Sequence, residues 1–136
     1  SACDDIAYID TKHITFEYSL QPTIIQANMN LIYIVINNLL SNAVKYSNEG
    51  AKIYVSCGEK DGKSYIRIQD EGCGIEKENI SKIFESFYRE KKDRNAEGFG
   101  LGLSQAMKIA ELYGGGIYVE STKNKGSIFT FFIPKP

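Results

Sequence analysis

Hydrophobic and polar residues alternate along three stretches of the chain, and a period of two predicts β-strands. The first stretch predicts a half-exposed strand that ends before Pro22. Asp61-Gly62 separates the second stretch from the third, and an Asp-Gly pair in this position is a strong signal for a β-hairpin. Two further stretches close the chain and predict a second hairpin. The predicted strands are residues 14–20, 51–59, 63–70, 117–121 and 127–133.

The period lengthens to that of a helix in two further stretches. Residues 28–46 carry apolar side chains at every fourth position, which predicts a helix of about five turns with a broad apolar face. Either Asn28 or Asn30 is suited to cap its start, and Ser47-Asn48-Glu49-Gly50 ends it. A second amphipathic helix is predicted over residues 101–113.

The region before this second helix has a different pattern. Residues 77–87 predict one short helix or two turns. Residues 88–98 are charged and almost devoid of apolar anchors, which predicts a flexible loop. Because helices alternate with antiparallel strand pairs, the sequence predicts a two-layer α/β (α+β) sandwich. Its mixed, largely antiparallel sheet is expected to be covered on one face by about three helices.

Length and composition restrict the class of protein. The 136 residues suit a single domain over residues 1–136. Sixteen Lys and Arg against 17 Asp and Glu leave a net charge of −1, which argues against binding nucleic acid through a broad basic surface. No apolar stretch approaches the ~18 residues of a membrane span, so no membrane contact by this domain is expected. The three cysteines lack metal-type spacing, which favours a reducing, cytoplasmic setting.

A polar stripe follows one side of the first predicted helix. Asn38, Asn42, Lys45 and Tyr46 lie side by side there, next to the apolar face. An amide oxygen suits Mg²⁺ that is already surrounded by phosphates, because it adds a donor atom without adding negative charge. Lys45 would supply a positive charge for phosphate oxygens. The alternative is that the stripe is simply the solvated side of the helix.

The turn from Asp70 to Ile75 begins where the third predicted strand ends. Gly72 and Gly74 permit backbone conformations closed to other residues and let a flat ligand approach closely. A carboxylate only accepts hydrogen bonds, so Asp70 suits an exocyclic amine such as that of adenine. An ordinary strand-to-helix turn is the alternative.

Alternating glycines lead into the second long helix. Gly98, Gly100 and Gly102 expose successive amide groups beside the positive end of a helix, which favours anions. Their spacing differs from the dinucleotide fingerprint, and no Walker-type sequence follows. Arg89, at the edge of the charged loop, is placed to stabilise a terminal phosphate during transfer. Ser127 either faces a ligand or is an ordinary hairpin residue.

The order of these motifs closely resembles the ATP-binding catalytic domain of sensor histidine kinases. The resemblance covers residues 15–134 and implies the Bergerat-type fold shared by a superfamily of ATPases and kinases. It also implies ATP and Mg²⁺ as cofactors, with residues 88–98 as the ATP lid. The matching segments are residues 38–47, 70–75, 83–89 and 98–103, with Gly115-Gly116-Ile117 and Gly126-Ser127 near the C-terminus.

This resemblance also implies roles for individual residues. Asn42 would hold Mg²⁺ with Asn38 supporting it, and Asp70 would bind the adenine amino group. The residues implied to be catalytic are Asn42, Lys45 and Arg89. The residues implied to bind ATP are Asn38, Asn42, Lys45, Tyr46, Asp70, Gly72, Gly74, Ile75, Gly98, Gly100, Leu101, Gly102, Leu103 and Ser127.

The sequence departs from the superfamily pattern at position 38. Superfamily members that hydrolyse ATP typically carry a glutamate four residues before the metal asparagine, where it activates water. The amide of Asn38 cannot take up a proton at useful pH, so phosphoryl transfer is favoured over hydrolysis. The alternatives are an ATPase or serine-directed kinase of the superfamily, and a module that binds ATP without transferring phosphate.

The phosphoacceptor is expected to lie outside the chain. Histidine kinases use a histidine that is usually followed by an acidic residue, whereas His13 is followed by Ile14 and is expected to be a bystander. The resemblance therefore implies the dimerisation domain of a longer parent kinase as partner, with a response regulator downstream. The isolated domain is expected to be monomeric and cytoplasmic.

Overall fold

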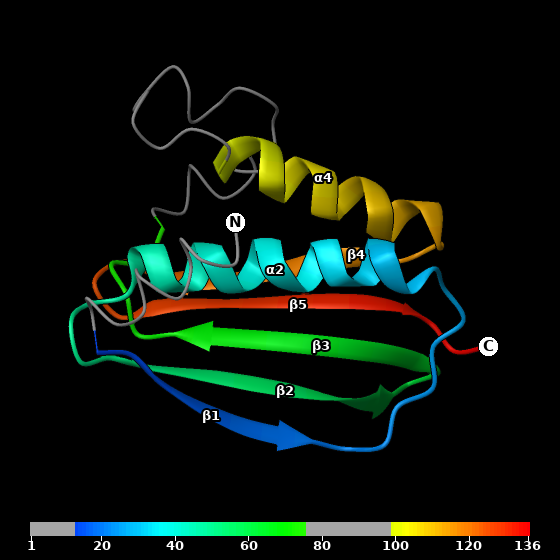
Figure 1. Ribbon diagram of the computed structural model, residues 1–136, viewed down its shortest axis with the longest axis horizontal. Helices are drawn as coiled ribbons and strands as arrows, with labels where there is room; N and C mark the ends of the chain where they lie inside the picture. Colours follow the sequence, from blue (N-terminus) through cyan, green and yellow to red (C-terminus); the bar gives the residue numbers. More distant parts are fainter. Residues whose placement is uncertain (1–12, 76–98) are drawn as a thin grey trace.

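Five strands form one mixed sheet in the order β1-β2-β3-β5-β4. A computed structural model of the chain describes residues 13–75 and 99–136. Within it, β1 runs parallel to β2, and all other neighbouring strands are antiparallel (Figure 1). The sheet confirms the predicted fold class. Its strands are β1 (Thr15–Leu20), β2 (Lys52–Lys60), β3 (Lys63–Asp70), β4 (Gly116–Thr122) and β5 (Gly126–Pro134).

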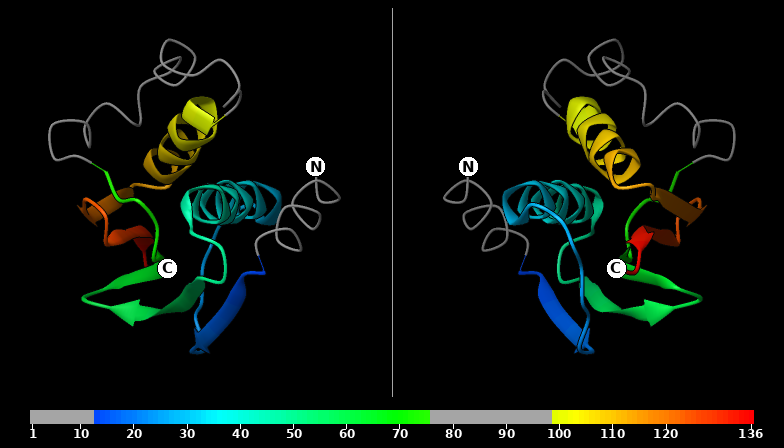
Figure 2. Two further views of the ribbon diagram at one scale, coloured as in Figure 1. Left: turned by 90° about the vertical axis from the view of Figure 1, so that its left-hand side faces the viewer. Right: turned by 90° about the vertical axis from the view of Figure 1, so that its right-hand side faces the viewer.

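Two helices, α2 (Met29–Tyr46) and α4 (Phe99–Leu112), lie on the same face of this sheet (Figure 2). Within the described ranges, neither helix is long and apolar enough to cross a membrane. The predicted elements at 77–87 and 88–98 lie outside the described residues, so a third helix is not tested. The apolar core between helices and sheet includes Ile32, Val35, Leu39, Ile53, Ile68, Leu103, Ala106, Phe129, Phe131 and Ile133.

The hairpin between β2 and β3 forms where the sequence predicts it. Asp61 and Gly62 have φ angles of 52° and 75°, and two successive positive φ angles are typical of a two-residue hairpin turn. This turn pairs Lys60 with Lys63 and sets the register, which places Asp70 opposite Ile53. Since side chains alternate between faces, Asp70 shares the helix-covered face with Ile68.

Strand β1 is more exposed than the predicted half-exposed strand. Only Phe16 is half-buried, while Tyr18 and Leu20 are 65% and 63% exposed. The reason is that β1 is the edge strand, and the two helices pack mainly against β3, β4 and β5. Alternation in the sequence predicts which side chains of a strand share a face, but it does not predict how far the strand lies from the helices that cover the sheet.

Helix α4 begins at Phe99, two residues before the predicted start at Leu101. Gly100 therefore lies inside the first turn of the helix, with Gly102, instead of preceding it. Glycine is a poor helix former, but burial of Leu103 and Ala106 in the apolar core supplies the tertiary packing that outweighs this local preference.

Helix α2 is capped by Asn28, one of the two predicted residues. The Asn28 side chain accepts a hydrogen bond from the backbone N–H of Asn30 at 2.8 Å. The backbone N–H of Asn28 donates to the Tyr113 hydroxyl at 2.9 Å, which ties the start of α2 to the segment after α4. Ser47 ends the helix, with its hydroxyl donating to the Ala43 carbonyl at 2.7 Å.

The cap can be tested by truncating its side chain. We expect Asn28→Ala to lower the free energy of unfolding by about 1 kcal/mol, because an N–H group of the first turn loses its acceptor. Urea denaturation measures this change. The control is Asn30→Ala, which leaves the Asn30 backbone donor in place, and an equal loss in both variants would contradict the assignment.

Candidate functional site

The carboxamide of Asn42 is buried between α2 and the rest of the fold. Asn42 is only 4% exposed to solvent. Because this member of the polar stripe is buried, the stripe is not simply the solvated side of the helix. Among the described residues, no hydrogen-bond partner lies within reach of its Oδ1 atom. Buried polar atoms are almost always hydrogen-bonded, and an exception calls for an explanation such as a missing ligand. A neutral amide oxygen also has the chemistry of a Mg²⁺ ligand, so the residue fits the implied metal.

Asn38 lies one turn before Asn42 and contacts the other helix. Its Nδ2 atom donates a hydrogen bond to the Gly102 carbonyl at 3.1 Å. Lys45 and Tyr46, the remaining members of the stripe, are half-buried. Through Asn38, this side of α2 therefore lies next to Gly102 in the first turn of α4.

Asp70 is the buried carboxylate of the candidate site and is only 3% exposed. Burial raises the pKa of Asp70 from 3.8 to about 6, because the charged form loses its hydration. Two backbone N–H groups, of Gly72 and Ser127, oppose this rise by donating hydrogen bonds to the carboxylate; the Gly72 bond measures 2.9 Å. An ionised carboxylate has about four acceptor sites on its two oxygens, so Asp70 can accept a further hydrogen bond in addition to these two.

The turn after Asp70 is held by protein backbone on both sides. The N–H of Cys73 donates to the Tyr46 carbonyl at 3.2 Å, and the Cys73 carbonyl accepts from Asn124 at 2.6 Å. A Cβ at Gly72 would collide with the carbonyl of Tyr46, and one at Gly74, where φ is +72°, with that of Thr122. Both glycines are thus required by the fold, whereas their contact with a ligand stays a prediction.

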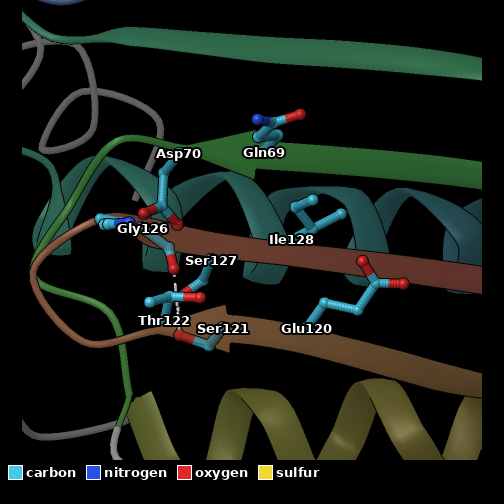
Figure 3. A pocket seen from close by; sticks show the side chains of 9 residues that line it. Gln69, Asp70, Glu120, Ser121, Thr122, Gly126, Ser127 and Ile128 are labelled. Atoms are coloured by element: carbon cyan, nitrogen blue, oxygen red, sulfur yellow. Dashed lines mark hydrogen bonds between the residues drawn. The ribbon is translucent and has the colours of Figure 1, made fainter.

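Ser121 joins three segments at the same end of the sheet, and sequence reasoning missed it. Its hydroxyl oxygen accepts from the Ile75 N–H at 2.7 Å. The same oxygen lies 2.9 Å from the Ser127 hydroxyl, and both serines are drawn in Figure 3. It also donates to the Gly126 carbonyl at 3.1 Å. Ser127 itself is buried, so its hydroxyl faces this cluster and not bulk solvent.

A pocket of about 240 Å³ lies beside this cluster, at the ends of β3, β4 and β5 (Figure 3). Asp70 and Ser127 line it, but none of Asn38, Asn42, Lys45 and Gly102 does. Alternation places Gln69, Glu120 and Ile128 on the face of the sheet opposite Asp70, so this pocket opens partly onto the uncovered face. It is therefore not by itself the predicted nucleotide cleft.

The remaining predicted site residues differ in what the structure describes. Gly98 and Arg89 lie outside the described residues, and Gly100 and Leu101 belong to the first turn of α4. Leu103 is 2% exposed and packs in the core. Ile75 is half-buried.

The chain belongs to the family of histidine kinase-, DNA gyrase B- and HSP90-like ATPases, whose model matches residues 27–136. Within this family, the catalytic domain of the histidine kinase ThkA, solved free of nucleotide, is 30% identical. The two share a TM-score of 0.81, and the match covers 98% of this chain and 86% of that one. The chain is thus the ATP-binding catalytic domain of the histidine kinase type, as its motifs predict.

Two longer proteins are also similar. The sensor histidine kinase WalK of Bacillus subtilis is 36% identical over 129 residues, which cover 90% of this chain and 21% of WalK. Full-length ShkA, solved in complex with AMPPNP, is 24% identical with a TM-score of 0.81, and shows the same fold over 94% of this chain and 27% of ShkA. The chain therefore spans less than a third of either relative.

The raised pKa of Asp70 predicts a pH-dependent stability. The folded state binds this proton more tightly than the unfolded chain, so the resulting stabilisation is present below about pH 4 and is lost as the pH rises through about 6. A difference of about two pKa units corresponds to roughly 3 kcal/mol. We expect Asp70→Asn to remove this contribution, as measured by urea denaturation between pH 4 and pH 8.

The control for this experiment is Glu71→Gln, which changes the neighbouring, exposed carboxyl. The Glu71→Gln variant should show the same change in the free energy of unfolding between about pH 4 and pH 6 as the parent chain. If the free energy of unfolding of Asp70→Asn depended on pH in the same way as that of the parent chain, Asp70 would not be the source of the pH dependence.

Proposed function

We propose that the chain binds Mg-ATP and transfers its γ-phosphate to a histidine on a dimerisation domain outside this chain. The observation that carries the proposal is the buried Asn42 oxygen, which has no hydrogen-bond partner among the described residues. Membership of the family and the AMPPNP bound by the similar protein ShkA support a nucleotide as the ligand.

In this proposal the two ends of the nucleotide are bound by different layers. Asp70 accepts a hydrogen bond from the adenine amino group, next to Ser127 and the turn at Gly72. Asn42 holds Mg²⁺, which neutralises charge on the phosphate oxygens when bound. The glycines of the first turn of α4 present backbone N–H groups to the phosphates.

The chain's residues position the phosphate and stabilise its charge, and no covalent step on the protein is required. The unprotonated nitrogen of the acceptor imidazole attacks the γ-phosphorus, and the bond from that phosphorus to the bridging oxygen breaks. ADP leaves with the electron pair, and the proton on the other imidazole nitrogen passes to solvent. Lys45 and Arg89 are proposed to stabilise the phosphoryl group during transfer.

Asn38 explains why transfer is proposed in place of hydrolysis. A general base must accept a proton from water, and a carboxamide does not do so near neutral pH. The geometry supports this view, because the Asn38 side chain is engaged with the Gly102 carbonyl. Water at the γ-phosphate would therefore lack an activating carboxylate at this position.

The acceptor histidine is proposed to belong to the parent kinase. His13 is exposed on the surface, and its Nδ1 lies 3.6 Å from Glu49. The relatives are longer proteins, of which the chain matches 21% of WalK, so other domains of the parent have room for the acceptor. A response regulator is proposed to receive the phosphoryl group downstream.

The metal assignment is tested by Asn42→Ala. We expect this variant to lose the increase in ADP affinity that Mg²⁺ gives the parent chain, because the amide ligand is removed. Calorimetric titrations with and without Mg²⁺ measure it, and circular dichroism checks the fold. Asn37→Ala, a half-buried neighbour on the same helix, is the control. Unchanged Mg²⁺ dependence in Asn42→Ala would show that the metal binds elsewhere.

The reaction type is tested by adding the dimerisation domain of the parent to this chain with γ-labelled ATP. We expect label on that domain that is stable to base and labile to acid, as phosphohistidine is, and little free phosphate from the chain alone. Rapid phosphate release by the isolated chain would favour an ATPase instead. Nucleotide binding without any transfer would favour a passive module.

A further inference from the structure

The hydrogen bond between Asn38 and Gly102 joins the two helices at the candidate site. Asn38 lies on α2, one turn before Asn42, and Gly102 lies in the first turn of α4. The bond connects residues 64 positions apart and is 3.1 Å long. We propose that Asn38 is a positioning residue, which holds the phosphate-binding turn of α4 at a fixed distance from Asn42.

Asn38 and Gly102 also pack closely against each other. A Cβ at Gly102 would lie 3.3 Å from Asn38 Oδ1 and 3.4 Å from its Cγ, which is tighter than most such contacts. The glycine therefore lets α4 approach the Asn38 side chain, while the amide donor fixes the approach. The carbonyl of Gly102 accepts only, so a donor is required at this position.

An amide is the side chain that meets this requirement at position 38. Asparagine carries an NH₂ group that donates to the carbonyl, whereas aspartate of nearly the same shape carries only acceptor oxygens. A carboxylate there would place negative charge against the carbonyl dipole of Gly102. The proposal thus gives asparagine a role at the position where a hydrolytic relative is expected to have a carboxylate.

The bond is positioned to affect phosphates and not the base. Asp70 is held by the N–H groups of Gly72 and Ser127, which belong to the sheet end of the site. Loosening α4 from α2 therefore changes the distance between Asn42 and the first turn of α4, while the groups around Asp70 keep their own contacts. This consequence rests on the proposed function, since it assumes that phosphates bind between the two helices.

The test compares Asn38→Asp and Asn38→Ala with the parent chain. The control is Asn37→Asp, which introduces the same charge one residue away on the same helix. The first measurement is hydrogen–deuterium exchange without nucleotide, over residues 103–106, whose N–H groups bond to the carbonyls of the first turn. The second is the Kd for Mg-AMPPNP and for adenosine, which carries the base without phosphates, by calorimetry.

We expect faster exchange over residues 103–106 in both Asn38 variants, with exchange over residues 107–112 unchanged. We also expect about tenfold weaker binding of Mg-AMPPNP, with the affinity for adenosine changed less than about twofold. Asn37→Asp should behave like the parent.

Three results would overturn the proposal. Unchanged exchange over residues 103–106 would show that the bond does not hold α4. Equal or tighter binding of Mg-AMPPNP by Asn38→Asp would indicate that position 38 contacts the metal directly, because a carboxylate is the stronger ligand. Equal loss of Mg-AMPPNP and adenosine affinity would indicate a general structural role. A parent chain that binds no nucleotide at all would instead contradict the proposed function, and the exchange data would still test the bond.

Discussion

The site is organised around Asn42, which is the one polar side chain among the buried residues of α2. Helix α2 buries Ile32, Val35 and Leu39 against the sheet, and the same packing draws Asn42 out of solvent. Burial of an amide oxygen without a hydrogen-bond partner lowers the free energy of unfolding by about 1–3 kcal/mol, as mutations in other proteins indicate. A ligand that supplies the missing interaction recovers this free energy, and its binding therefore stabilises the folded protein.

Asp70 shows the same relation between stability and function at the other end of the site. Burial raises its pKa to about 6, which means that the carboxylate is held in the fold against its hydration. The hydrogen bonds from Gly72 and Ser127 reduce this cost without removing it. Both polar groups of the site thus lower the stability of the empty protein, as expected for residues retained for binding.

Much of the fold follows from local patterns in the sequence. Alternation predicts β1, β2 and β3, Asp61-Gly62 predicts the turn between β2 and β3, and the capping preference of asparagine predicts the start of α2. The start of α4 could not be predicted in this way, because glycine preferences favour a loop there and only packing of Leu103 and Ala106 extends the helix. The exposure of β1 depends on strand order, which local patterns do not contain.

The site residues were predictable as types, but their contacts were not. Asn42 and Asp70 stand out because polar residues interrupt apolar patterns or end a strand. The bond from Asn38 to Gly102 spans 64 positions and that from Ile75 to Ser121 spans 46, so both arise only after the layers have packed. The most direct measurement is a crystal structure of this chain with Mg²⁺ and AMPPNP. The account predicts the ion about 2.1 Å from Asn42 Oδ1 and the adenine amino group on Asp70. A nucleotide bound elsewhere, or an ion without contact to Asn42, would contradict it.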